Sequence, residues 1–186
     1  MKRYKDSKSV YAAYGVDTEA ALASLADITV SVHCWQGDDV GGFDSPDALS
    51  GGIQTTGNYP GRARNGEELR KDFLKAISMI PGKKKLNLHA SYAELHGKKI
   101  DRDAYTAEQF SDWMDFAREN KLALDFNPTY FSHPYAADGF TLASTNETHR
   151  KFWIEHGKRC REIGNEFQKR LGKVCAINYW MPDGMK

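Results

Sequence analysis

Apolar residues follow two alternating patterns along the chain. Short runs rich in β-branched or aliphatic side chains, typical of buried strands, cover 28–35, 86–90, 122–127 and 174–180. Longer stretches in which apolar residues return every three or four positions, as on one face of a helix, cover 66–80, 106–117 and 147–171. Strands that alternate with helices predict a parallel sheet built from right-handed crossovers.

Capping residues mark the ends of the predicted helices. Thr106 with Gln109, and Ser144 with Glu147, have the spacing of a capping box at a helix start. Gly172 is expected to end the last helix, because glycine readily takes the left-handed conformation found there.

Two segments flank the first predicted strand. Residues 1–27 predict two short N-terminal helices, the second capped by Asp17 or Thr18. Residues 36–64 show no period and contain seven glycines. A loop of this length is uncommon unless it serves as a lid or binding loop. We therefore expect a long active-site loop, with a plain surface insertion as the alternative.

Two architectures compete for this order of elements. A doubly wound sheet would have a glycine-rich phosphate turn after a strand, which residues 37–42 (GDDVGG) match poorly. A (β/α)8 TIM barrel places polar and aromatic groups at the C-terminal ends of its strands, before long loops. All four predicted strands end in this way. The sequence thus predicts an α/β fold, a (β/α)8 barrel with only its first four strands present in this chain.

The strand ends supply the candidate site residues. His33 and His89 could bind a substrate, relay protons or ligate a metal. Trp35, Phe126 and Trp180 could form an apolar wall against the hydrocarbon face of a sugar. Each of these side chains could equally be packed inside the barrel, and spacing alone leaves both interpretations open.

Composition narrows the classes of partner. The 26 Lys and Arg residues nearly balance the 25 Asp and Glu residues, so no basic excess predicts a nucleic-acid partner. The chain has no run of about 18 apolar residues, and none behind its N-terminus, which predicts no membrane partner and a cytoplasmic location. Cys34, Cys160 and Cys175 are widely spaced, and we expect free thiols. Asp125 lies within a strand, where a structural role is expected.

Several longer strings resemble the L-rhamnose isomerase family of bacteria. VHCWQGDDV at 32–40 is similar to the first-strand motif of that family, and GGIQTTGNYPG at 51–61 is similar to its long loop. The other matching strings are LNLHA at 86–90, LDFNP at 124–128, FSHP at 131–134, DGFTL at 138–142, FWIEH at 152–156 and WMPDGMK at 180–186.

This resemblance implies a barrel enzyme of rhamnose catabolism that interconverts L-rhamnose and L-rhamnulose. By analogy, His89 would hydrogen-bond the sugar near its ring oxygen or O5, and Phe126 and Trp180 would pack against its apolar side. The family uses a divalent metal, typically Mn²⁺, and forms homotetramers. Its metal ligands belong to later strands, so the resemblance assigns no metal ligand and no certain catalytic residue to this chain.

Residues 1–186 are accordingly expected to be the N-terminal half of a single TIM-barrel isomerase domain, inactive alone. One alternative is a stand-alone sugar-binding or assembly half-barrel without catalysis. Another is a different metal-dependent barrel enzyme that acts on another deoxy-sugar.

Overall fold

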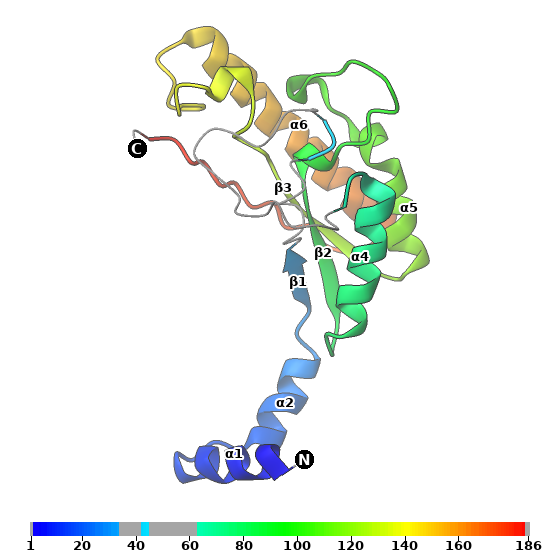
Figure 1. Ribbon diagram of the computed structural model, residues 1–186, viewed down its shortest axis with the longest axis vertical. Coiled ribbons are helices and arrows are strands. Elements are labelled where there is room, and N and C mark those ends of the chain that lie inside the picture. The colour runs from blue at the N-terminus through cyan, green and yellow to red at the C-terminus, as the bar shows by residue number, and fades with distance from the viewer. Residues whose placement is uncertain (1, 34–41, 45–62, 185–186) are drawn as a thin grey trace.

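A small parallel sheet forms the centre of the molecule in the computed structural model, which describes residues 2–33, 42–44 and 63–184 (Figure 1). Its three strands lie in the order β1-β2-β3. They are β1 (Val30–His33), β2 (Lys84–His89) and β3 (Ala123–Asn127). Both neighbouring pairs are parallel, as the alternation of strands and helices predicts.

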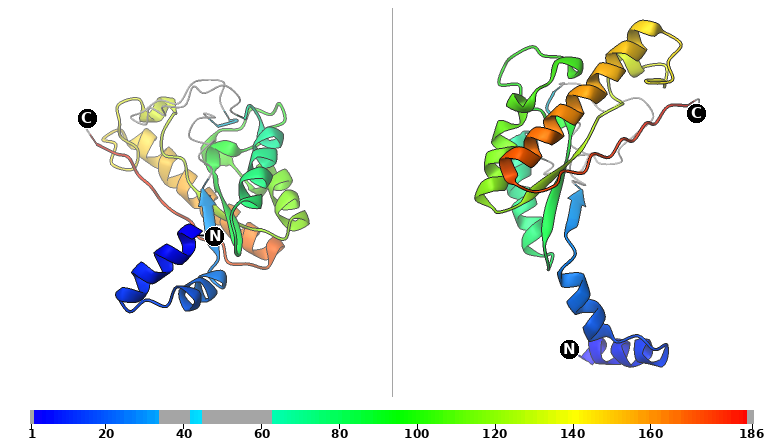
Figure 2. Two further views of the ribbon diagram at one scale, coloured as in Figure 1. Left: turned by 60° about the horizontal axis from the view of Figure 1, so that its bottom comes forward. Right: turned by 180° about the vertical axis from the view of Figure 1, so that it is seen from behind.

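Helices connect the strands and cover one face of the sheet (Figure 2). The α-helices are α1 (Lys2–Ala13), α2 (Thr18–Ala26), α4 (Gly66–Ser78), α5 (Ser111–Glu119) and α6 (Glu147–Leu171). Short 3₁₀ turns are η1 (Ala90–Tyr92), η2 (Arg102–Ala104), η3 (Ala107–Phe110) and η4 (Pro134–Ala136). The predicted crossover helices are thus confirmed as α4, η3 with α5, and α6.

The two faces of the sheet differ in chemistry because successive side chains of a strand point to opposite sides. Leu86, Leu88 and Leu124 are fully buried, and they share one apolar core with α4, α5 and α6. Polar residues occupy the alternate positions. Parallel sheets are usually apolar on both faces, so a polar face on this sheet marks the side on which a site can form.

The observed helix ends agree with the predicted caps except at the start of α6. Thr106 and Gln109 form a complete capping box, which opens η3 ahead of α5. Gly172 ends α6 with a left-handed φ of 65°. The capping box predicted at Ser144 is wrong, because Asn146 is the residue that caps α6. The Ser144 hydroxyl instead accepts a hydrogen bond from the Asn146 amide.

The fourth predicted strand, 174–180, is not a regular strand. It joins β3 through a single parallel bridge between Phe126 and Ile177. The Phe126 amide donates to Ala176 O (2.9 Å), and the Asn178 amide donates to Phe126 O (3.0 Å). The Ala176 amide, which the next ladder step would use, donates instead to Asp125 Oδ1 (2.8 Å). This side-chain contact interrupts the ladder.

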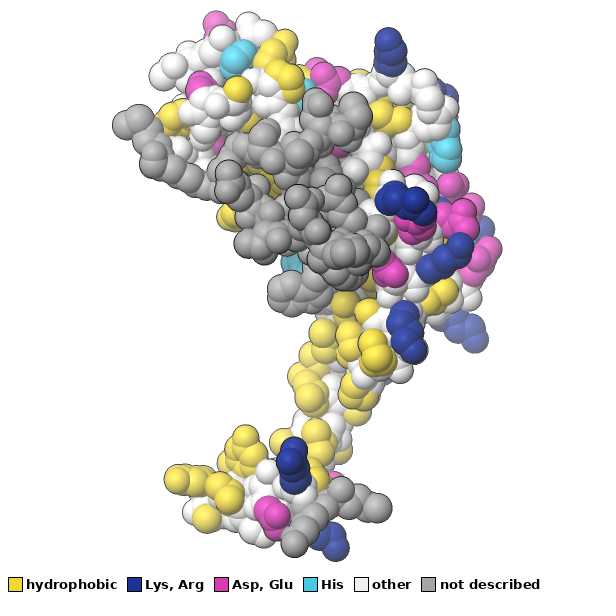
Figure 3. Space-filling view, viewed as in Figure 1, with side chains coloured by type: hydrophobic (Ala, Val, Ile, Leu, Met, Phe, Trp, Pro, Cys, Tyr) yellow, Lys and Arg dark blue, Asp and Glu magenta, His cyan; other side chains and the backbone are white. Residues whose placement is uncertain are grey.

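Helices α1 and α2 form an arm that extends from the N-terminal end of β1 (Figure 1). They correspond to the two helices predicted within 1–27, and Asp17 is the N-cap of α2. Apolar side chains lie exposed along the arm (Figure 3), and α2 has no buried residue. None of the helices that the structure describes has a stretch long and apolar enough to cross a membrane.

Candidate functional site

Four polar side chains gather where β1, β2 and β3 end. The register places His33 beside Asn87, and His89 beside Asn127. Within each pair an amide contacts an imidazole: Asn87 Nδ2 lies 3.2 Å from His33 Nε2, and Asn127 Nδ2 lies 3.5 Å from His89 Nε2. We call His33, Asn87, His89 and Asn127 the strand-end cluster. The structure thus brings both predicted histidines to one edge of the sheet.

The strand-end cluster keeps unused hydrogen-bonding capacity. Asn87 Oδ1, His89 Nδ1 and Asn127 Oδ1 are buried and have no hydrogen-bond partner among the described residues. Buried polar atoms are nearly always hydrogen-bonded in folded proteins. The cluster therefore has the donors and acceptors that a polyhydroxylated ligand would satisfy.

His89 is held as a neutral imidazole. Burial, followed by the nearby His33 and Arg102, lowers the pKa of His89 to about 4. If Asn127 donates to Nε2, the ring proton lies on Nδ1. That arrangement makes Nδ1 a hydrogen-bond donor available to an oxygen of a bound molecule.

Aromatic rings line the space beside His89. Its imidazole makes edge contacts with Tyr92 (centroids 5.5 Å apart) and Phe131 (6.3 Å). Phe131 in turn contacts Trp180 (5.9 Å), whose side chain is half exposed. Trp180 therefore lies close to His89 through Phe131. Tyr92 and Phe131 are neighbours of His89 that the strand-end pattern did not include. Their place in loops directly after β2 and β3 is the signal that could have identified them.

The structure does not bring Phe126 to this edge. Its ring is fully buried between Phe110 (5.0 Å) and Phe167 (5.4 Å) on the side of the sheet that the helices cover. Alternation along β3 explains this placement, because Asn127 shares the face of His89 and its neighbour Phe126 must point the other way. The ring of Phe126 therefore faces the core, and Phe131 is the ring that lies beside His89. Trp35 lies outside the described residues.

Asp125 has the structural role expected of it. Its carboxylate accepts from Ser31 Oγ (2.6 Å) on β1 and from Lys85 Nζ (3.1 Å) on β2, besides the Ala176 amide. One buried carboxylate thus joins β1, β2, β3 and the segment after α6. Both carboxylate oxygens of Asp125 therefore have partners that lie outside the strand-end cluster.

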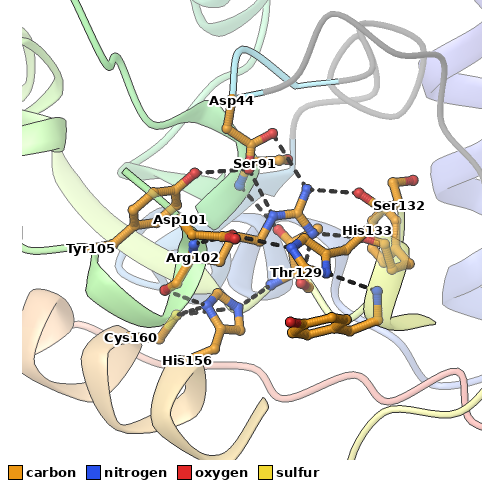
Figure 4. A network of polar contacts seen from close by, with 12 residues as sticks. Asp44, Ser91, Asp101, Arg102, Tyr105, Thr129, Ser132, His133, His156 and Cys160 are labelled. Carbon is orange, nitrogen blue, oxygen red and sulfur yellow. Dashed lines mark hydrogen bonds and ion pairs between the residues drawn. The ribbon is translucent and has the colours of Figure 1, made fainter. Parts of the chain in front are cut away.

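A buried polar network lies behind the loops that follow the strands (Figure 4). His156 of α6 accepts from the Thr129 amide at Nε2 (3.1 Å), and its Nδ1 lies 3.1 Å from Arg102 O. Burial lowers the pKa of His156 to about 3, so the ring stays neutral. The position of His156 on a helix does not by itself predict this role.

Two of the three predicted free thiols lie within the described residues. Cys160 is buried and Cys175 is partly buried, and both are free. Burial raises the pKa of Cys175 to about 12 and that of Cys160 further. Neither thiol is a nucleophile near neutral pH. Cys34 lies outside the described residues.

The described side chains do not make a metal centre. Among them, no three His, Cys, Asp or Glu side chains are grouped so that they could hold an ion. His33 and His89 are the nearest candidates, but each faces an amide group. The described residues therefore do not fit a divalent metal site by themselves.

The fold is that of an α/β protein, with helices on one face of a parallel sheet. Its polar groups gather at the carboxyl ends of the strands, the edge at which proteins of this class bind small molecules. A family model described as "L-rhamnose isomerase (RhaA)" matches residues 1–186. The chain therefore belongs to the L-rhamnose isomerase family.

Curated relatives agree with the family match. The L-rhamnose isomerase of Mannheimia succiniciproducens is 55% identical over 187 residues, which cover 100% of this chain and 44% of the relative. The L-rhamnose isomerase of Listeria monocytogenes serotype 4a is 54% identical over 186 residues, again 100% of this chain and 44% of the relative. That of Klebsiella pneumoniae subsp. pneumoniae is 54% identical over 181 residues, 97% of this chain and 43% of the relative. The chain thus spans less than half the length of these relatives.

Proposed function

We propose that this chain is the N-terminal part of a (β/α)8 barrel enzyme that interconverts L-rhamnose and L-rhamnulose. Membership of the L-rhamnose isomerase family supports the reaction, and the length of the relatives supports the remainder of the barrel. The polar face of the three-stranded sheet would line the barrel interior, and the strand-end cluster would form part of the sugar site.

The observation that carries this proposal is the strand-end cluster, whose buried polar atoms include three that have no hydrogen-bond partner within the described part of the chain. A sugar presents hydroxyl groups that both donate and accept hydrogen bonds, and it has apolar C–H faces. In the proposed complex, His89 Nδ1 donates to a sugar oxygen, while Asn87 Oδ1 and Asn127 Oδ1 accept from hydroxyl groups. Phe131 and Trp180 cover the apolar side, as side chains beside a carbohydrate commonly do.

The metal and the assembly belong to the same proposal. The divalent ion, Mn²⁺, would be bound by residues of the longer polypeptide, and the assembled enzyme would be a cytoplasmic homotetramer. The contribution of residues 1–186 is then to bind and orient the sugar. Orientation of a reactant is itself a large part of catalysis, because it replaces a random encounter with a fixed geometry.

The substrate is tested with the full-length polypeptide that contains residues 1–186. Loaded with Mn²⁺, it should convert L-rhamnose to L-rhamnulose with a higher kcat/KM than it shows for other aldoses. A clear preference for another sugar would contradict the proposal that L-rhamnose is the substrate. Absence of any aldose–ketose isomerisation would contradict the proposed reaction.

Fragment complementation tests the proposal that residues 1–186 supply only part of the active site. Residues 1–186 alone and the remaining segment alone should both be inactive, and the two co-expressed should recover isomerase activity. Activity of residues 1–186 alone would contradict the proposal that this chain supplies only part of the site.

A further inference from the structure

The guanidinium of Arg102 uses all five of its N–H donors, although the side chain is almost completely buried. Nε donates to Asp44 Oδ2 (2.7 Å) and Nη2 to Asp44 Oδ1 (3.3 Å), a two-point ion pair (Figure 4). The remaining donors go to the main-chain oxygens of Phe131 (2.5 Å), Thr129 (3.1 Å) and Ser132 (3.2 Å). Tyr105 Oη adds a further hydrogen bond to Asp44 (3.0 Å).

These contacts join the loops that follow all three strands. Asp44 comes after β1, Arg102 comes after β2, and the three carbonyl groups come after β3. A second set of contacts joins the same loops, since the Phe43 amide donates to Ser91 O (2.6 Å) and the Ser91 amide donates to Thr129 Oγ1 (3.1 Å). Arg102 is thus the central link at the edge of the sheet that carries the strand-end cluster.

Two aromatic residues, one next to Asp44 and one among the Arg102 acceptors, connect this network to His89 through ring contacts. Phe43, next to Asp44, packs against Tyr92 with ring centroids 5.7 Å apart, and Tyr92 contacts His89. Phe131, whose carbonyl oxygen Arg102 binds, contacts His89 from another direction. Arg102 thus holds the loop whose ring, Phe131, contacts His89, and the loop whose ring, Phe43, packs against Tyr92.

The backbone at one end of the link is strained. Ser132 has a φ of 52°, in the left-handed region that side-chain-bearing residues seldom occupy. Its carbonyl oxygen is one of the Arg102 acceptors. Strained residues persist where the surroundings hold them, and they cluster at functional sites. A buried ion pair is also weak as a source of stability, because burying both charges offsets their attraction.

We propose that Arg102 is a positioning residue for the sugar site, which fixes Asp44 and the loop at Thr129–Ser132 so that the aromatic rings stand correctly beside His89. The inference rests on the proposed function, since it assigns Arg102 a role in the same site. Arg102 acts through the loops and does not itself contact the sugar.

The test compares Arg102→Lys with Arg159→Lys in the full-length enzyme. Lysine keeps the charge of Arg102 but lacks the planar fork that serves four acceptor residues at once. Arg159 is a matched control, because it lies on α6, contacts the same 3₁₀ turn at Asp103 O (3.3 Å) and is more exposed. Kinetics are measured at a temperature at which circular dichroism shows every variant fully folded.

Arg102→Lys should lower kcat/KM for L-rhamnose by about ten- to a hundredfold, the range that a misplacement of about 1 Å produces, with a raised KM accounting for much of the change. Arg159→Lys should match the wild type. Asp44→Asn, which keeps the shape of the Arg102–Asp44 pair, should also lower kcat/KM and raise KM. It replaces Arg102→Lys as the test variant if Arg102→Lys does not fold.

Unchanged KM and kcat in a folded Arg102→Lys or Asp44→Asn variant would overturn the positioning role and leave the proposed function intact. A wild-type enzyme without isomerase activity would instead overturn the proposed function, so the two failures are distinguishable.

Discussion

Replacing Phe126 with leucine separates a role in the core from a role at the sugar site. The ring makes two edge-to-face contacts, with Phe110 at 5.0 Å and Phe167 at 5.4 Å. Such aromatic pairs each contribute about 0.5–1.5 kcal/mol beyond simple burial. Leucine keeps most of the apolar volume and loses both contacts. We therefore expect Phe126→Leu to lower the free energy of unfolding by about 1–3 kcal/mol.

The same variant should leave sugar binding unchanged. In the full-length enzyme, the KM for L-rhamnose should stay within about twofold of the wild type, since a tenfold change would require about 1.4 kcal/mol at the site. Urea denaturation gives the stability and steady-state kinetics gives the KM. Phe131→Leu is the matched comparison, because Phe131 is also buried but contacts His89 and Trp180. Phe131→Leu should raise the KM, and an equal rise in Phe126→Leu would refute the placement of the two rings.

Three further predictions follow from individual side chains. His89→Ala in the full-length enzyme should lower turnover while the bound metal, measured by elemental analysis, stays near the wild-type level; loss of metal would show that His89 has a different role. The free energy of unfolding should fall as the pH drops from about 6.5 toward 4, because unfolded His89 binds a proton near its usual pKa of 6.5 while folded His89 does so only at about 4. The His89 contribution to this loss amounts to about 3 kcal/mol, beside that of the buried His156, and His89→Gln should show a flatter profile in urea titrations across that range. Asp125→Asn should cost about 2 kcal/mol, because it weakens charge-assisted hydrogen bonds to Ser31 and Lys85; an unchanged urea midpoint would contradict the role of this carboxylate.

The regular elements could be predicted because their signals are local. Three β-strands and the crossover helices follow from residue type and periodicity, and Thr106 with Gln109 forms the expected cap. The cap expected at Ser144 forms at Asn146 instead, because both are good capping residues and lie only two positions apart. The last predicted strand does not form as a regular strand, and the reason is non-local: the Asp125 carboxylate accepts the hydrogen bond of the Ala176 amide.

Only the part of the candidate site that lies at the C-terminal ends of the strands could be predicted from the sequence. His33 and His89 follow from that principle, and Trp180 lies near them through Phe131. The face on which Phe126 lies follows from strand alternation combined with the pairing of His89 and Asn127, and that register is a property of the assembled sheet. The pair of Arg102 and Asp44 joins residues 58 positions apart in loops, where no periodic pattern operates.

The location of the sugar is the central claim, and a crystal structure of the full-length enzyme with bound L-rhamnose tests it most directly. We predict a sugar oxygen at hydrogen-bond distance from His89 Nδ1, about 2.7–3.2 Å, with the ring of Phe131 beside the apolar side of the sugar. A sugar bound away from the C-terminal ends of β2 and β3, with His89 Nδ1 beyond hydrogen-bond distance, would contradict the account.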